Sequence, residues 1–428
     1  MKIYDNPARS EWPALLQRPA KDLTNLRAPV LDIMQAVRER GDEALRELTA
    51  RFDGVEATDL RVPAATLAAA ADQLSDELKA AIRTAKDNIE RFHESQRTNA
   101  TEVETMPGVT CWREARAIDR VGLYVPGGTA PLFSTVLMLA VPARLAGCGE
   151  IVLCSPPGRQ TGEIHPAVLY AAGLCGVTQV FRVGGSQAIA AMAYGTDSVP
   201  QVYKIFGPGN AYVTVAKQLA QLDGLAIDMP AGPSEVLVGA DAGAEVSWVA
   251  ADLLAQAEHG PDSQVVLVSP SLEQAEAVRR EVERQLADLP RREMAAASIA
   301  NSLAVVLPDA ADQLAYINAY APEHLILSRT DARAFAAGIT NAGSIFLGYY
   351  TPESVGDYAS GTNHTLPTYG YARNYSGVSL DSFVKKITFQ QLTQDGLRAL
   401  GPAVVTMADA EELRGHAVAV EVRLADLS

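Results

Sequence analysis

The chain has 428 residues, of which 48% are hydrophobic, 6% aromatic and 20% charged, so its composition is that of an ordinary globular protein of roughly two or three domains. A formal net charge of −15, with no compensating basic run, argues against nucleic acid as a partner, because phosphate binding depends on lysine and arginine. No stretch approaches the ~20 uninterrupted apolar residues of a membrane span, and the first residues lack the apolar segment of a signal peptide, so we expect a cytoplasmic protein with no membrane partner.

The N-terminal part is predicted to be an arm followed by helices. Residues 1–20 contain scattered prolines and no clear period, which is typical of an arm. In residues 22–98 apolar residues recur at helical spacing, and Asp53-Gly54 interrupts the pattern. The residues expected to share helical faces are Val30, Ile33, Met34 and Val37, and then Leu67, Leu74, Leu78 and Ile82.

From about residue 120, short apolar runs typical of β-strands end in glycine or proline turns and precede alanine-rich helices. One series of runs begins at residues 121, 151, 179 and 202, and a second at residues 234, 264, 303, 325 and 344. The second series is separated by predicted helices at 244–259, 271–288 and 309–319. Strands that alternate with helices of this length predict parallel βαβ units.

The predicted fold class is therefore α/β, with two Rossmann-like open parallel sheets, flanking helices and a small helical C-terminal tail. We expect residues 121–229 to form the second α/β domain. The helices of residues 21–120 then need a sheet to cover, and we assign them, together with residues 230–375, to a larger α/β domain. Residues 376–428 are predicted to form the tail, and we detect no internal repeat.

Three glycine-rich turns follow strands of the first series, namely Gly127-Gly128, Gly184-Gly185 and Gly207-Pro208-Gly209. Because ligands bind at the carboxyl ends of parallel strands, these turns could form a nucleotide-binding rim. None of them matches Gly-x-Gly-x-x-Gly, since residue 212 is a tyrosine, and tight turns also need glycine for structural reasons alone. The turns leave both interpretations open.

Two pairs of polar residues in the second half of the chain suit catalysis. Gln256 and His259 lie three residues apart at the end of a predicted helix, which suits two metal ligands on one face, although a histidine there can also simply interact with the helix dipole. Glu323 and His324 are adjacent and follow a proline. They suit proton transfer if an irregular backbone turns both toward one cavity, and are otherwise a solvated pair in a loop.

The remaining polar candidates lie in loops and in the tail. A small-residue loop at 354–361 holds Asp357 and is followed by His364, and either could bind a metal. Glu411 and His416 occupy the charged tail, where an exposed helix face is the simpler interpretation, although a tail can complete a site across a dimer interface. Two other histidines are interpreted as surface residues, His93 and His165. The four cysteines form no Cys-x-x-Cys pair and are expected to be buried and reduced: Cys111, Cys148, Cys154 and Cys175.

Six motifs, in order over nearly the full chain, resemble those of histidinol dehydrogenase. They are Val121–Gly128, Lys204–Asn210, Asp228–Leu237, Gln256–Asp262, Pro322–His324 and Gly356–His364. The resemblance implies a zinc enzyme of histidine biosynthesis that oxidises L-histidinol to L-histidine through the aldehyde and reduces two NAD molecules. It also implies a homodimer in which the tail of each subunit reaches into the active site of the other.

The resemblance assigns roles to residues as well. It implies one Zn²⁺ per subunit, with ligands at Gln256, His259, Asp357 and His416. It implies an acid/base pair at Glu323 and His324, and cofactor contacts at Tyr124, Gln187 and Asn210. The implied substrate contacts are Ser234, His324, Glu411 and the four zinc ligands. His364 is then expected to be a bystander. The family usually carries asparagine two residues after the tail histidine, whereas this chain has Val418, which weakens any argument about groups that support His416.

The chemistry fits these roles. A near-neutral imidazole suits removal of the alcohol proton by His324, and Glu323 is expected to activate the water that hydrates the aldehyde. Zinc is expected to anchor the substrate, since it has no accessible redox chemistry. A zinc hydrolase is the first alternative, but it leaves the glycine turns unexplained and would lack a His-Glu-x-x-His helix. The second alternative, a binding protein without catalysis, does not account for the adjacent glutamate and histidine.

Overall fold

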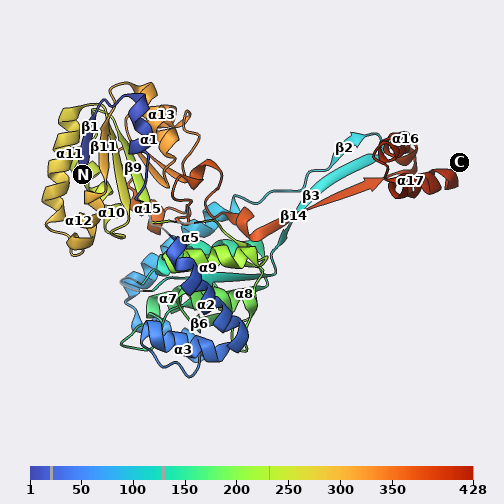
Figure 1. Ribbon diagram of the computed structural model, residues 1–428, viewed down its shortest axis with the longest axis horizontal. Coiled ribbons are helices and arrows are strands. Elements are labelled where there is room, and N and C mark those ends of the chain that lie inside the picture. The colour runs from blue at the N-terminus through green and yellow to red at the C-terminus, as the bar shows by residue number, and fades with distance from the viewer. Residues whose placement is uncertain (20–22, 128–130, 231, 428) are drawn as a thin grey trace. The chain divides into compact units, whose positions relative to one another are not determined.

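The structure is a computed structural model that describes residues 1–19, 23–127, 131–230 and 232–427 (Figure 1). Gly128 of the first glycine turn and the predicted domain boundary at residues 20–22 lie outside the described residues. The chain divides into two compact units, of which unit 1 comprises Met1–Gln96 and Ile118–Phe383, and unit 2 comprises Arg97–Ala117 and Val384–Ser428. No helix in the described ranges combines the length and apolar character that crossing a membrane requires.

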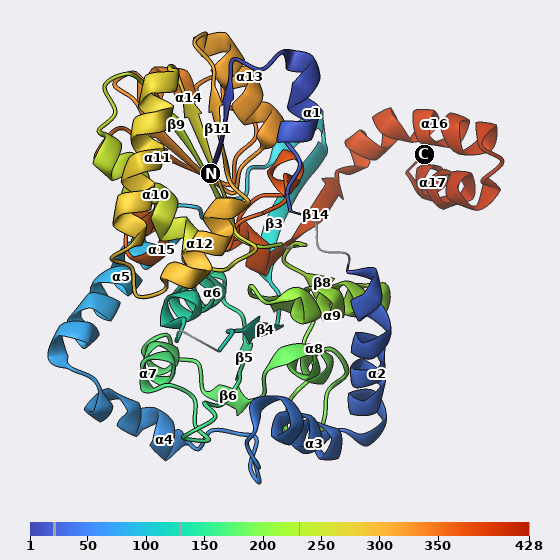
Figure 2. The ribbon, with the colours of Figure 1, turned by 60° about the vertical axis from the view of Figure 1, so that its left-hand side comes forward.

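Unit 1 contains a six-stranded parallel sheet, here called the first sheet, with the order β1-β11-β10-β9-β12-β13. Its strands are β1 (Lys2–Asp5), β9 (Glu235–Ala240), β10 (Gln264–Ser269), β11 (Leu303–Val306), β12 (His324–Ser328) and β13 (Ser344–Leu347). Val236 and Val238 pack on one face, with residues of α10, α11 and α12, and Leu237 packs on the other, with residues of α1 and α13. These two sets of helices lie on opposite sides of the sheet (Figure 2). The helices of this part are α1 (Trp12–Leu15), α10 (Val246–Ala257), α11 (Leu272–Leu286), α12 (Arg292–Ala300), α13 (Ala310–Tyr320), α14 (Ala332–Ala336) and α15 (Glu353–Tyr358).

Unit 1 also contains a five-stranded parallel sheet, the second sheet, with the order β6-β5-β4-β7-β8. Its strands are β4 (Arg120–Tyr124), β5 (Glu150–Ser155), β6 (Gln179–Arg182), β7 (Lys204–Phe206) and β8 (Ala226–Ile227). Val121 and Leu123 of β4 pack against α5, α6 and α7, whereas Tyr124 packs toward α2, α3, α8 and α9. The helices are α2 (Thr24–Arg40), α3 (Asp42–Asp53), α4 (Ala64–Ala69), α5 (Asp76–Glu94), α6 (Phe133–Ala146), α7 (Pro166–Leu174), α8 (Gly185–Tyr194) and α9 (Ala211–Leu222).

Two predictions about domain membership are corrected. The helices of residues 24–94 pack on the second sheet, not on the sheet that follows residue 230, since α2 and α3 contact α8 and α5 contacts α6 (Figure 1). The apolar face of α2 meets the alanine-rich side of α8, where small side chains allow close approach. The predicted arm also begins with an ordered strand, because β1 pairs with β11 and places Ile3 and Tyr4 on opposite faces of the first sheet.

The two sheets share one strand order. In the second sheet β6, β5 and β4 lie side by side, and β7 and β8 follow on the other side of β4. In the first sheet β11, β10 and β9 lie side by side, and β12 and β13 follow on the other side of β9. The order therefore reverses between β4 and β7 in the second sheet and between β9 and β12 in the first. Open α/β sheets bind ligands at such switch points outside the carboxyl ends of the strands, which predicts a ligand site beyond β4 and β7 in the second sheet.

Unit 2 is built on an antiparallel sheet with the order β14-β3-β2. Its strands are β2 (Val103–Met106), β3 (Val109–Ala117) and β14 (Val384–Leu392), and its helices are α16 (Gln394–Ala410) and α17 (Arg414–Asp426). Trp112 stacks on Phe389 across β3 and β14, with ring centroids 5.2 Å apart. The prediction of a helical tail is confirmed for α16 and α17, but the same segment also contains β14, whose mostly exposed residues gave no clear strand pattern.

Candidate active site

Glu323 and His324 lie at the amino ends of the first sheet's central strands. His324 is the first residue of β12 and pairs with Val236 of β9. Just before it, Ala321 adopts a left-handed conformation with φ of 54°, which turns the chain between α13 and β12. The turn brings the two side chains together, with Glu323 Oε2 and His324 Nδ1 3.6 Å apart and both residues about 5% exposed or less. This is the irregular backbone that a shared cavity requires.

A buried ion pair supports this turn. The backbone N–H of Glu235 donates to Glu323 Oε2 at 2.8 Å, and the backbone N–H of Glu323 donates to Glu235 Oε1 at 3.3 Å. Arg18 in turn donates from Nε and Nη2 to the two carboxylate oxygens of Glu235, at 2.7 and 2.8 Å. A bidentate pair of this kind fixes geometry as well as charge. The N-terminal segment thus helps to hold the Glu323–His324 turn.

Three carboxylates surround the His324 ring. Besides Glu323, Glu353 Oε1 lies 3.7 Å from Nδ1 and Asp357 Oδ1 lies 3.3 Å from Nε2. Glu353 and Asp357 are four residues apart on α15, so they share a helix face. Burial alone would lower the pKa of His324, but these carboxylates outweigh it and hold the pKa well above its ordinary value. Burial raises the pKa of Glu323 to about 8.

His259 and Asp357 interact electrostatically with each other and with His324, and Gln256 lies three residues before His259. Gln256 lies on α10, which packs against α15, and both its side-chain Oε1 and Nε2 are buried with no hydrogen-bond partner in the described part of the chain. His259 is open to solvent on one side, yet burial of its ring lowers its pKa despite the nearby charge of Asp357. Burial opposes ionisation of Asp357, but His324 outweighs it and lowers the pKa of Asp357. A neutral imidazole, an ionised carboxylate and an unpaired amide are a donor set that suits zinc.

The other predicted site residues are placed as follows. Ser234 lies directly before β9 and accepts a hydrogen bond through its carbonyl from the backbone N–H of Gln264 at 3.3 Å. Glu411 and His416 belong to unit 2, the first at the end of α16 and the second within α17, and both are exposed. Unit 1 thus brings together all the predicted metal and acid/base residues except His416.

Three histidines fall outside this group of residues. His165 caps α7 at an exposed position, as the surface interpretation expects. His93 is not a surface residue: it is fully buried, with Nδ1 2.9 Å from the Ile89 carbonyl, because it lies on the apolar face of α5. His364 bridges the Asp357 carbonyl, 2.8 Å from Nδ1, and the Thr135 hydroxyl, 3.3 Å from Nε2.

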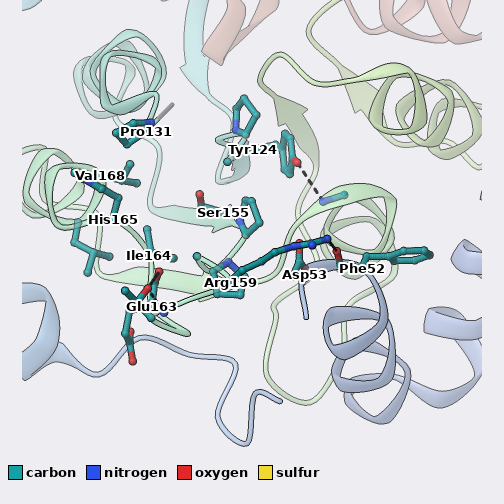
Figure 3. Close-up of a pocket in the computed structure, with 18 of the residues that line it drawn as sticks. Phe52, Asp53, Tyr124, Pro131, Ser155, Arg159, Glu163, Ile164, His165 and Val168 are labelled. Atoms are coloured by element: carbon teal, nitrogen blue, oxygen red, sulfur yellow. Dashed lines mark hydrogen bonds between the residues drawn. The ribbon is translucent and has the colours of Figure 1, made fainter. Parts of the chain in front are cut away.

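A cavity of about 1180 Å³ lies at the carboxyl ends of the second sheet's strands (Figure 3). Its wall includes Tyr124 at the end of β4, Gln187 in the first turn of α8 and Asn210 directly before α9. The Tyr124 hydroxyl accepts from the Gly185 N–H at 3.1 Å. At Gly207, φ is +129° and a Cβ atom would lie 2.1 Å from the Tyr124 carbonyl oxygen, so only glycine fits. Gly127 and Gly185 are part of the cavity wall, whereas Gly207 serves the close approach of two backbone segments beside it.

Sequence reasoning missed several residues of these two sites. Glu353 could have been found, because it lies four residues before Asp357 and both would share a helix face. The Arg18–Glu235 pair joins residues 217 positions apart, and no local pattern indicates such a contact. Asp53 also lines the cavity, although it was noted only as part of a helix-breaking Asp-Gly pair.

Comparisons with known proteins concern the sequence and the fold as a whole. The histidinol dehydrogenase family profile matches residues 16–424. A histidinol dehydrogenase from Bacteroides fragilis is 57% identical over 427 residues, covering 100% of both chains, and one from Shigella dysenteriae is 55% identical over 413 residues, covering 96% of this chain and 94% of the other. The crystal structure of histidinol dehydrogenase from Elizabethkingia anophelis superposes with a TM-score of 0.96 at 53% identity, covering 100% of this chain and 98% of that one.

A more distant similarity concerns the fold alone. An acetylating aldehyde dehydrogenase from Geobacillus thermoglucosidasius has a TM-score of 0.50 at 14% identity. The matches to histidinol dehydrogenases are much stronger, because the family profile spans residues 16–424 and the relatives are more than 50% identical over nearly the whole chain. The chain therefore belongs to the histidinol dehydrogenase family.

Proposed function

We propose that this chain oxidises L-histidinol to L-histidine through L-histidinaldehyde, with two molecules of NAD, as the final step of histidine biosynthesis. The single observation that carries the proposal is the gathering of Gln256, His259, Asp357, Glu323 and His324 at one end of the first sheet. The proposal assigns the cavity of the second sheet to NAD, with Tyr124, Gln187 and Asn210 in contact with it. Its volume of about 1180 Å³ lies slightly above the usual size range of small-molecule sites, which leaves room for a dinucleotide.

The proposal assigns one Zn²⁺ per subunit to Gln256, His259, Asp357 and His416. The two unpaired atoms of the buried Gln256 amide support it, because buried polar groups almost always have partners. When bound, Zn²⁺ supplies a Lewis acid that anchors the substrate's imidazole and amine and thereby holds the reactive aldehyde between the two oxidations. Ser234, His324 and Glu411 are assigned to the substrate together with the zinc ligands.

The acid/base work is assigned to the adjacent pair. In its neutral form, His324 accepts the proton of the alcohol as hydride leaves the substrate carbon for NAD, passes that proton to solvent, and later accepts the proton of the aldehyde hydrate. The surrounding carboxylates favour the protonated imidazole, and Zn²⁺ bound at Asp357 would oppose them and favour the neutral base. Glu323 deprotonates the water that adds to the aldehyde. A pKa of about 8 suits this task, since a group that titrates near the working pH exchanges protons most readily.

The proposal includes a homodimer with shared active sites, in which His416 and Glu411 serve the site of a second copy. Exposed apolar side chains on α16 and α17 support an interface there, among them Met407 at 65% exposed and Val422 at 52%. The proposal also places the enzyme in the cytoplasm. The four cysteines support a reducing compartment, because no disulfide joins any of them in the described part of the chain.

One assay tests the proposed reaction. The purified protein, loaded with Zn²⁺, is mixed with L-histidinol and NAD, and NADH absorbance is followed with and without a chelator. We expect two NADH per histidinol consumed, and loss of the signal after chelation that added Zn²⁺ restores. Absence of NADH formation by the metal-replete protein would contradict the proposal, and a yield of one NADH would contradict the two-step oxidation.

A further inference from the structure

Asp53 presents an unpaired carboxylate to the cavity of the second sheet. It is the last residue of α3, and Gly54 follows in a left-handed conformation with φ of 71°. Asp53 lines the cavity together with Tyr124 and Arg159 (Figure 3), and Gln187 belongs to the same wall. Its Oδ2 atom is buried and has no hydrogen-bond partner among the residues that the structure describes. Burial raises the pKa of Asp53 to about 6, against the opposing charge of Arg159.

This carboxylate differs from the other one in the cavity wall. Glu163 is bound by Arg182, whose Nε and Nη2 donate to its two oxygens at 2.9 and 3.1 Å. The buried Oδ2 atom of Asp53 has no such partner in the described ranges, although leaving a buried acceptor unpaired is energetically unfavourable. An acceptor left open at a cavity wall is suited to a ligand that brings its own donors.

The position of Asp53 indicates which donors these are. In dinucleotide-binding sheets an acidic residue at the end of the second strand accepts a hydrogen bond from the ribose 2′-hydroxyl. Here that strand is β5, and it ends at Ser155 with Pro156, Pro157 and Gly158 following, so no acid stands there. Asp53 faces the same cavity from α3, and its charge raises the pKa of Tyr124 at the end of β4, after the larger effect of burial.

We propose that Asp53 accepts hydrogen bonds from the vicinal hydroxyls of the adenosine ribose of NAD and thereby excludes NADP. The inference rests on the proposed function, since it takes the cavity to be the NAD site. An ionised carboxylate binds a ribose diol and repels a 2′-phosphate. Arg159 has the opposite preference, and its Nη2 donates to the Phe52 carbonyl at 3.2 Å, directly beside Asp53. Cofactor choice is set by the balance between this carboxylate and this guanidinium.

The test compares dissociation constants of NAD and NADP, measured by calorimetry on the zinc-loaded protein, for the wild type, Asp53→Asn and Asp53→Ser. We expect NAD affinity to fall about ten- to a hundredfold, as for loss of a hydrogen bond to a charged group, and NADP affinity to rise. Adding Arg159→Gln to Asp53→Ser removes the gain in NADP affinity. Glu56→Gln is the matched control: it removes a carboxylate that is exposed, three residues away and outside the cavity wall, and leaves both affinities unchanged.

An analogue makes the test independent of folding defects. NAD lacking the 2′-hydroxyl on its adenosine ribose binds the wild type more weakly than NAD does, whereas Asp53→Ser binds the two equally. Gln187→Ala separates this inference from the proposed function. If Gln187→Ala weakens NAD binding while the Asp53 variants keep the wild-type preference for NAD over NADP, Asp53 does not read the ribose and the cavity assignment stands. If neither position affects NAD binding, both assignments are overturned.

Discussion

His324 Nε2 lies 3.3 Å from Asp357 Oδ1, so the proposed general base is in contact with a proposed zinc ligand. The first begins β12 and the second belongs to α15, which also carries Glu353 on the other side of the imidazole. A cation bound by Asp357 would therefore act directly on the charge around His324. The arrangement couples substrate anchoring to acid/base chemistry within one group of buried side chains.

Gln256→Leu provides a test of the metal assignment that does not depend on activity. Both polar atoms of the Gln256 side chain are buried and unpaired, so replacing them by an apolar group of similar size removes a desolvation penalty of about 1–3 kcal/mol. We expect the metal-free variant to unfold at a higher temperature than the metal-free wild type. We expect it to retain less Zn²⁺ by elemental analysis, and to gain less thermal stability when Zn²⁺ is added.

Gln313→Leu is the control for this substitution. Gln313 is equally buried, but its Nε2 donates to the Leu307 carbonyl and its Oε1 accepts from Arg329, each at 2.7 Å. Its replacement is expected to lower stability with and without metal and to leave Zn²⁺ content unchanged. A Gln256→Leu variant that behaved in the same way would show that Gln256 has a structural role only.

Glu323→Gln separates the two oxidations. Only the second one needs an activated water, so we expect oxidation of histidinaldehyde to fall by about 10²-fold or more and oxidation of histidinol to fall less. Glutamine keeps the acceptor for the Glu235 N–H, which preserves the turn. Single-turnover measurement of NADH from each substrate checks the prediction. Equal impairment of both oxidations would show that Glu323 serves them in the same way.

The sequence predicts individual helices and strands better than it predicts which of them pair or pack together. The nine strands predicted after residue 120 all lie in the two parallel sheets, because buried strands leave a strong local signal. The strands β1, β2, β3, β8 and β14 were missed, since they are edge strands or strands exposed on both faces. The common strand order of the two sheets was also undetectable, because it is a property of topology and not of residue identity.

In the candidate site, too, local relationships could be predicted and contacts between distant segments could not. Spacing could suggest that Gln256 and His259 act together, but it could not show that Asp357, 98 residues after His259, lies among the charges around that imidazole. That contact depends on the packing of α15 against α10. Helix packing of this kind depends on distant segments of the chain. The assignment of roles at the sequence level therefore came from the family resemblance, and the geometry came from the fold.

The Arg18–Glu235 pair is predicted to be both a stability and a positioning element. Their side chains are 8% and 2% exposed, so Arg18→Met leaves an uncompensated buried carboxylate and is expected to cost about 3–5 kcal/mol in the free energy of unfolding. The double variant Arg18→Met/Glu235→Gln removes both charges and is expected to recover part of this loss. Urea denaturation of the two single variants and the double variant measures the coupling.

The exposed pair Arg9–Asp312 is the control, with side chains 67% and 34% exposed. Arg9→Met is expected to change stability by about 1 kcal/mol or less, because solvent screens such pairs. If Arg18→Met proved as mild as Arg9→Met, the pair would not support the Glu323–His324 turn. The activity of Arg18→Met, measured where it remains folded, is expected to fall in kcat, since Glu235 also accepts from the Glu323 N–H.

Asp53 predicts a pH dependence whose sign can be worked out. Burial raises its pKa from 3.8 to about 6, so between these values the folded, NAD-free protein binds more protons than the unfolded chain. Stability therefore falls as pH rises through this window, and the penalty is complete above about pH 6. The side-chain amide of the Asp53→Asn variant cannot ionise. We expect this variant to have the higher thermal midpoint at pH 8, by on the order of a few degrees, and the advantage to disappear near pH 4.

Saturating NAD is expected to reverse this order at pH 8, because the ionised carboxylate then has its donors and the wild type gains more from the ligand. Glu56→Gln again serves as the control and should follow the wild type at every pH. Scanning calorimetry of the three proteins, with and without NAD, distinguishes the outcomes. A midpoint difference between wild type and Asp53→Asn that stays constant from pH 4 to pH 8 would show that Asp53 does not titrate in this window. A difference that varied with pH but was unaffected by NAD would show that the carboxylate is strained by burial without serving the cofactor.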